Sequence, residues 1–194
     1  MKRIGVFCGS SSGRRPAYTG LAELLGKALA ERELGLVYGG GRVGLMGSVA
    51  RAVLDAGGSV TGVIPESLVR KEVAFEELSD LRVVDSMQER KTLMAELSDA
   101  FVALPGGYGT LDELVEMLTW TQLGFHDKPS GLLNTEGYFD KLLQFFDDNV
   151  QEGFLPAAHR TMLLVEEDPK TLLDRLASSE PPTVDKAQWT LDGG

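Results

Sequence analysis

The chain has 194 residues, 43% of them hydrophobic and 25% charged, which fits a single globular domain of ordinary size. Nineteen basic residues against twenty-nine acidic ones give a net charge of −10. We therefore expect no binding to nucleic acid or to an anionic membrane, because both need a broad cationic surface. No stretch approaches the roughly 20 apolar residues of a membrane span, and the apolar run at the amino end is too short for a secretory signal. The single cysteine, Cys8, excludes an intrachain disulfide, so the expected location is cytoplasmic.

Strand-like and helix-like patterns alternate along the chain. Short apolar runs predict strands, and longer stretches with leucines and alanines three and four apart predict helices. In chain order we expect a strand at 4–8, a helix at 17–32, a strand at 36–38, a helix at 45–55, strands at 60–64 and 81–84, a helix at 87–98, a strand at 100–104, a helix at 111–123, and strands at 131–133 and 162–165, each followed by a helix. This alternation is typical of parallel βαβ units.

The predicted fold is therefore α/β: one Rossmann-like domain, 1–177, with a doubly wound sheet of about seven parallel strands and helices on both faces. The remaining segment, 178–194, contains paired prolines and little periodicity. We expect it to be a loosely ordered carboxyl-terminal tail.

Glycine is over-represented, with 23 residues, and the glycines cluster directly after strand-like runs. In doubly wound sheets ligands bind at the carboxyl ends of strands, so function is expected in these loops. The Gly39–Gly44 loop matches G-x-G-x-x-G, in which bare backbone and a helix N-terminus favour a phosphate. A tight turn would explain the same glycines. An NAD enzyme usually carries this pattern at its first strand–helix turn, where this chain instead has Cys8–Gly13.

A second loop of this kind, Pro105–Thr110, follows a later strand and precedes a helix. Thr110 and Glu113 also fit a capping box, which would explain these two residues without any function. It would not explain the three glycines of the loop. Two loops suited to phosphate on one small domain predict a mononucleotide that is bound from two sides.

Arg90 stands where a hydrophobic residue is expected. The apolar positions of the 87–98 helix recur at spacings of three and four, and Arg90 falls on the same stripe. A buried arginine usually meets an anion, and the alternatives are a bound nucleotide or a structural carboxylate, Asp85, Glu89 or Glu113. If the preceding strands are neighbours, Arg90 and Glu113 converge on one pocket. There a carboxylate could stabilise a cationic ribose or activate water while a glycosidic bond breaks.

The segment PGGYGTLDE, Pro105–Glu113, fits the P-G-G-x-G-T-x-x-E signature of the Lonely Guy (LOG) family, and MQERK, Met87–Lys91, resembles its M-x-x-R-K element. The loops at Cys8–Ser11 and Gly39–Gly47 are also similar, and the resemblance runs from about Ile4 to Val165. Members are cytokinin-activating nucleoside 5′-monophosphate phosphoribohydrolases, formerly mislabelled as lysine decarboxylases. The resemblance implies hydrolysis of the N-glycosidic bond of a purine nucleoside 5′-monophosphate, a homodimer, and no metal or organic cofactor.

The resemblance also assigns roles to individual residues. Arg90 and Glu113 would be the catalytic pair, and the glycine loop would hold the 5′-phosphate. The substrate-binding residues that it implies are Gly106, Gly107, Gly109, Thr110, Lys91, Glu72, Gly41, Met46 and Ser10. The alternative function is a carrier of a nucleotide or a molybdopterin-type cofactor that catalyses nothing. Glu113 beside Arg90 favours catalysis, because a carrier of an anion gains little from a carboxylate in its pocket.

Overall fold

The computed structural model describes residues 1–69, 71 and 74–180. Glu72 and residues 181–194 of the expected tail lie outside the described residues. The elements are β1 (Arg3–Phe7), α1 (Pro16–Glu31), β2 (Gly35–Tyr38), α2 (Gly44–Asp55), β3 (Val60–Pro65), α3 (Glu66–Val69), β4 (Asp80–Val84), α4 (Met87–Leu97), β5 (Ala100–Ala103), α5 (Tyr108–Gln122), β6 (Ser130–Leu133), the 3₁₀ helix η1 (Thr135–Gly137), α6 (Asp140–Gln151), α7 (Ala157–Arg160), β7 (Leu163–Glu166) and α8 (Pro169–Ser178).

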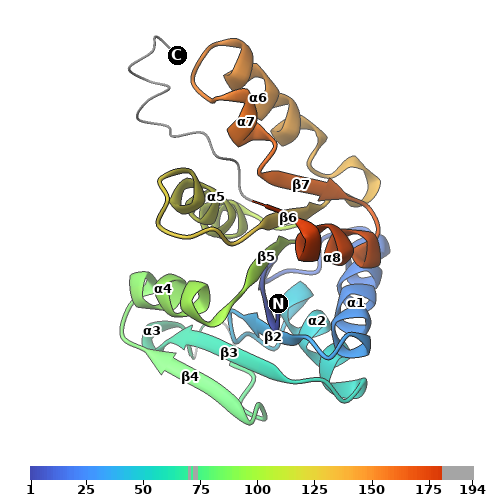
Figure 1. Ribbon diagram of the computed structural model, residues 1–194. Coiled ribbons are helices and arrows are strands. Elements are labelled where there is room, and N and C mark those ends of the chain that lie inside the picture. The colour runs from blue at the N-terminus through green and yellow to red at the C-terminus, as the bar shows by residue number, and fades with distance from the viewer. Residues whose placement is uncertain (70, 72–73, 181–194) are drawn as a thin grey trace.

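The strands of the described residues form one parallel sheet in the order β4-β3-β2-β1-β5-β6-β7 (Figure 1). The chain builds outward from β1 to one edge and then continues from β5 to the other. The order of the strands therefore reverses between β1 and β5, where open α/β sheets bind their ligands. The predicted α/β fold with about seven parallel strands is confirmed.

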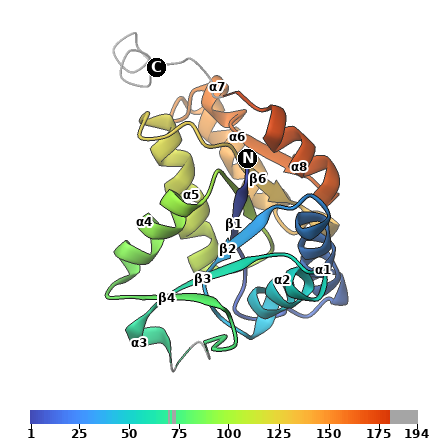
Figure 2. The same cartoon turned by 60° about the horizontal axis from the view of Figure 1, so that its bottom comes forward.

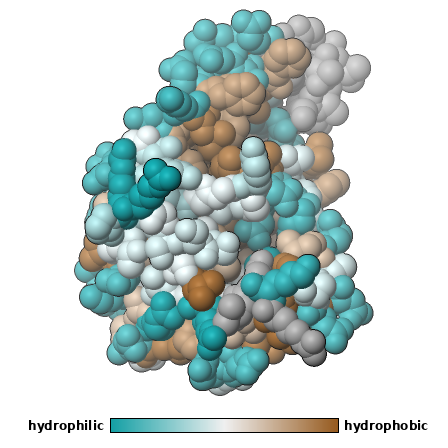
Figure 3. All heavy atoms as spheres, turned by 180° about the vertical axis from the view of Figure 1, so that it is seen from behind, coloured by the Kyte–Doolittle hydropathy of each residue, from teal (hydrophilic) through white to brown (hydrophobic). Residues whose placement is uncertain are grey.

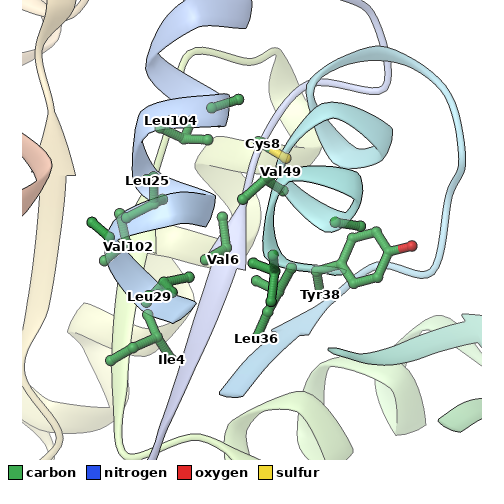
Figure 4. Close-up of a cluster of buried hydrophobic side chains, with 14 of the residues drawn as sticks. Ile4, Val6, Cys8, Leu25, Leu29, Leu36, Tyr38, Val49, Val102 and Leu104 are labelled. Atoms are coloured by element: carbon green, nitrogen blue, oxygen red, sulfur yellow. The ribbon is translucent and has the colours of Figure 1, made fainter. Parts of the chain in front are cut away.

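Helices cover both faces of the sheet (Figures 1 and 2). Successive residues of a strand point to opposite faces, and in β1 the side chains of Ile4 and Val6 belong to one buried cluster while Phe7 belongs to another. The first cluster takes its helical residues from α1, α2 and α8, and the second from α4, α5 and α6. Figure 4 shows part of the first cluster, with Leu25, Leu29 and Val49 of the helices near Ile4, Val6 and Leu36 of the strands.

The start of α5 differs from the prediction. The helix begins at Tyr108, its N-cap is Gly107, and no side chain caps it. Thr110 therefore lies inside the helix, where it is buried against Gly106. The capping-box interpretation of Thr110 and Glu113 is wrong, because a threonine within the first turn cannot serve as the N-cap. The short elements α3, η1 and α7 were also not predicted.

Candidate active site

A crevice of about 280 Å³ opens at the carboxyl edge of the sheet, between the first turns of α4 and α5. The ends of β1 and β2 and the loop after β5 contribute its remaining walls, so it lies at the point where the strand order reverses. Of the predicted site residues, those that line the crevice are Ser10, Met46, Arg90, Gly107, Gly109, Thr110 and Glu113. Sequence segments far apart along the chain thus meet in one small volume.

Backbone carbonyls hold the guanidinium of Arg90, which is only 5% exposed. Its Nε donates to the carbonyl of Val63 at 3.1 Å and its Nη2 donates to the carbonyl of Gly39 at 3.1 Å. Its Nη1 lies 3.7 Å from the sulfur of Met87. Because Val63 lies within β3 and Gly39 directly follows β2, the sheet itself fixes the position of this cation.

Gly39 makes room for Arg90. A Cβ at this position would collide with the Nη2 of Arg90 and would lie 3.0 Å from the sulfur of Met46. No side chain can be added here unless the guanidinium moves. Gly39, the first glycine of the GGG run, therefore lets the Arg90 side chain approach the backbone closely. The sequence pattern alone had attributed this glycine to the binding of a phosphate.

Glu113 enters the same crevice from the second turn of α5 and is 9% exposed. Its charge and that of Arg90 both act on the thiol of Cys8 at the end of β1. Burial raises the pKa of Cys8, the carboxylate of Glu113 raises it further, and the guanidinium of Arg90 opposes this rise. One buried thiol therefore lies within the field of both charges, and it stays protonated at neutral pH.

Arg90 and Glu113 thus line one crevice, as predicted, but the condition on which this was predicted is wrong. The strands before their helices, β4 and β5, are not neighbours, because β3, β2 and β1 lie between them. The two side chains meet because Arg90 reaches toward the centre of the sheet, to the carbonyls of Val63 and Gly39.

The N-terminus of α5 forms the wall beside Glu113. Its first turn contains no acidic residue and no side-chain cap, so its N–H groups are not occupied by a capping side chain. A Cβ at Gly107 or Gly109 would meet nothing within 4 Å. Packing within the protein does not require these glycines, but they leave the backbone open to a ligand. A helix N-terminus with bare N–H groups favours an anion.

Lys91 does not line the crevice. Its Nζ contacts Asp112 at 3.1 Å and Glu116 at 3.2 Å, both on α5. Burial works against its charge, but the hydrogen bonds to these two carboxylates raise the pKa of Lys91 overall. The side chain thus joins α4 to α5, and a role beside the phosphate remains a prediction.

Two of the predicted glycines also lie outside the crevice lining. Gly41 forms an isolated bridge with Ala74, and Gly106 lines a neighbouring cavity on the other side of the glycine loop. Sequence reasoning in turn did not assign Met87 and Tyr108, which line the crevice. Met87 lies in the MQERK segment and Tyr108 in the PGGYGTLDE segment, so the two family motifs already indicated that both residues lie near the site.

Among the described residues, no group of three or more histidine, cysteine, aspartate or glutamate side chains is placed to hold a metal ion. Within the same part of the chain, every helix is too short or too polar to cross a membrane.

The fold and the crevice together define a Rossmann-like α/β protein whose site lies at the switch point of its sheet. The family model described as "Possible lysine decarboxylase" matches residues 46–176, and the chain belongs to this family. It is 54% identical to the probable cytokinin riboside 5′-monophosphate phosphoribohydrolase LOGL9 of Oryza sativa subsp. japonica, over 93% of this chain and 79% of that protein. It is 51% identical to the cytokinin riboside 5′-monophosphate phosphoribohydrolase LOG7 of Arabidopsis thaliana, over 93% and 83%. The predicted membership of the LOG family is confirmed.

Among solved structures, the chain is similar to the molybdenum cofactor carrier protein of Chlamydomonas reinhardtii. The TM-score is 0.70, the sequence identity is 23%, and the match covers 92% of this chain and 99% of that one. At this level of identity the similarity concerns the fold alone. It therefore gives no support to a carrier function for this chain.

Proposed function

We propose that the protein is a hydrolase that cleaves the N-glycosidic bond of purine nucleoside 5′-monophosphates and releases the free base and ribose 5-phosphate. The substrates are AMP or a monophosphate with an N6-modified, cytokinin-type adenine. The observation that carries the proposal is the pair of buried charges, Arg90 and Glu113, in one crevice beside the open N-terminus of α5. The names of the relatives at about half identity support the same reaction.

The reaction follows from what each wall of the crevice offers. The N–H groups of Gly107 and Gly109, with the hydroxyl of Ser10, bind the 5′-phosphate and hold the nucleotide in place. As the bond from C1′ to the base breaks, positive charge develops on the ribose, and the carboxylate of Glu113 stabilises it. Water adds to C1′, its hydroxyl stays on the ribose, and its proton goes to the departing base. Arg90 orients the substrate and supports the leaving base.

Glu113→Gln tests this assignment. The amide keeps the shape of the side chain but loses the charge, so we expect turnover to fall by about 10²–10⁴-fold. Release of free base from AMP and from isopentenyl-AMP, followed by chromatography, measures it. Glu96→Gln is the matched control, because Glu96 is exposed on α4 and does not line the crevice. Near-normal turnover in Glu113→Gln would reject the role, and a wild-type protein that binds monophosphates without releasing base would favour the carrier.

We further propose that the protein works as a cytoplasmic homodimer. The support for a dimer is a set of exposed aromatic residues at the end of the molecule that carries α5, α6 and α7. Phe154 is 77% exposed, Phe125 72% and Phe145 58%. In the space-filling view, hydrophobic residues gather in the upper part of the molecule, where α6 and α7 lie (Figure 3). Proteins that work as monomers rarely leave large apolar patches in contact with water.

The substitution Phe154→Glu tests whether the surface with the exposed aromatic residues is the dimer interface. A charge placed in an apolar interface without a partner is costly, so we expect light scattering to report a monomer at concentrations where the wild type is a dimer. Val83→Glu is the control, because Val83 is also exposed but lies on β4 at the opposite edge of the sheet. A dimer that persists in Phe154→Glu contradicts the assigned surface, and a monomeric wild type contradicts the dimer itself.

A further inference from the structure

The glycine loop before α5 is held by its carbonyl groups. The hydroxyl of Tyr138 donates to the carbonyl of Gly106 at 2.7 Å. The N–H of Gly9, in the loop after β1, donates to the carbonyl of Pro105 at 3.0 Å. Two successive peptide groups of the loop are therefore fixed from outside, by residues that lie far away in the sequence.

Fixing a carbonyl also fixes the next N–H group. A trans peptide is planar, and its C=O and N–H bonds point in opposite directions. The described peptides include no cis bond. The bond from Tyr138 therefore sets the direction of the Gly107 N–H, and the bond from Gly9 sets that of the Gly106 N–H. Two adjacent glycines have more backbone freedom than any other pair, so this loop needs such restraints.

Tyr138 and the catalytic pair line two different cavities that meet at the loop, with Gly9, Ser10 and Gly107 lining both. The ring of Tyr138 lines a cavity of about 340 Å³ that it shares with Tyr18, Pro105 and Gly106. Arg90 and Glu113 line the other cavity, and Gly107 contributes to both. A Gly106 carbonyl held by Tyr138 directs the N–H of Gly107 away from the Tyr138 hydroxyl.

The ring of Tyr138 is itself well supported, although the residue is 42% exposed. The ring of Tyr18 meets it edge-on, with centroids 5.4 Å apart, and the ring of Phe139 does so at 4.7 Å. Both contacts are of the edge-to-face kind that aromatic pairs prefer. The aromatic contacts fix the position of the Tyr138 ring, and its hydroxyl donates the hydrogen bond that holds the glycine loop.

We propose that Tyr138 is a positioning residue for the 5′-phosphate of the substrate. It fixes the Gly106–Gly107 peptide so that the N–H of Gly107 faces the crevice, and it strengthens that donor, because a hydrogen bond to the carbonyl of a peptide polarises its N–H. The inference rests on the proposed function for the identity of the ligand. It requires only that the ligand carries a phosphate.

Tyr138→Phe tests the inference, because it removes the hydroxyl and keeps the ring with its aromatic contacts. Calorimetry would measure the affinity of ribose 5-phosphate, which carries the phosphate, and of adenosine, which lacks it. From the usual contribution of one neutral hydrogen bond, we expect ribose 5-phosphate to bind about three- to tenfold more weakly. The affinity for adenosine should change less than about twofold on the same scale. Tyr18→Phe is the matched control, since it alters the neighbouring ring without touching Gly106, and both affinities should stay at the wild-type level.

An unchanged affinity for ribose 5-phosphate in Tyr138→Phe would overturn the inference. Equal losses for ribose 5-phosphate and adenosine would overturn it as well, because they would mean a general disturbance of the crevice. Binding is measured without turnover, so the outcome is independent of the proposed reaction. A wild-type protein that releases no base but shows the selective loss in Tyr138→Phe would refute the reaction and keep the role of Tyr138.

Discussion

Two cavities of about 280 Å³ each lie along α5, and they differ in the residues that line them and in the polarity of those residues. The crevice at the start of the helix contains the buried charges Arg90 and Glu113 and the exposed backbone of the glycine loop. The second cavity lies beside the later turns of α5, between α6 and α7. Its lining is mainly apolar, with Phe146, Leu155 and Leu163 among its residues. Its buried histidine, His159, is engaged by Gln122, with 3.0 Å between Nδ1 and Nε2.

The difference shows that place in the fold, rather than volume, decides which cavity is suited to chemistry. The first turn of α5 meets the carboxyl edge of the sheet, where helix N–H groups and strand-end carbonyls are available to polar partners. The later turns face other helices, where burial favours apolar groups and costs free energy for a polar group unless it has a hydrogen-bond partner, as His159 has in Gln122. One helix thus contributes to a polar site at its start and to a hydrophobic space further along.

Gly39→Ala, at the polar crevice, should reduce turnover much more than a substitution in the apolar cavity. The added Cβ collides with Nη2 of Arg90, so the guanidinium must leave its two carbonyls. A displacement of about 1 Å in a catalytic group costs about 10²-fold in rate, and we expect a loss of that size in base release. Gly20→Ala is the matched control. Gly20 lies within α1 and its Cβ would meet nothing within 4 Å, so that variant should keep full turnover and gain up to about 1 kcal/mol in stability. Wild-type turnover in Gly39→Ala would mean that the position of Arg90 is unimportant.

Leu163→Ala should leave turnover nearly unchanged while it weakens the fold. Leu163 is 5% exposed and lines the apolar cavity, so truncation enlarges a space that is already empty of protein atoms. We expect the free energy of unfolding in urea to fall by about 2–4 kcal/mol. The rate of base release per folded molecule should stay within about twofold of the wild type. A selective loss of turnover in this variant would break the distinction between the two cavities.

The sequence predicted the sheet and its helices because the strands of such a sheet are buried on both faces and read as short apolar runs. It also predicted that Arg90 and Glu113 share a pocket, but on the condition that the strands before their helices are neighbours. That condition is not met, because β4 lies at one edge of the sheet and three strands separate it from β5. The hydrogen bonds of Arg90 to the backbone carbonyls of Gly39 and Val63 could not be predicted in this way. Every residue type has such a carbonyl, so the sequence does not indicate which ones accept. The hydrogen bond between Tyr138 and Gly106 could not be predicted from the sequence either, because it depends on how the loop after β6 returns to the edge of the sheet.

The ion pairs of Lys91 have a consequence for the width of the crevice. Lys91 follows Arg90 on α4, and its carboxylate partners, Asp112 and Glu116, flank Glu113 on α5. Asp112 is 59% exposed and Glu116 19%, so water and dissolved ions reach part of this link. The span between the guanidinium of Arg90 and the carboxylate of Glu113 is therefore braced by a contact that ionic strength weakens. The guanidinium itself is held by backbone carbonyls within the protein.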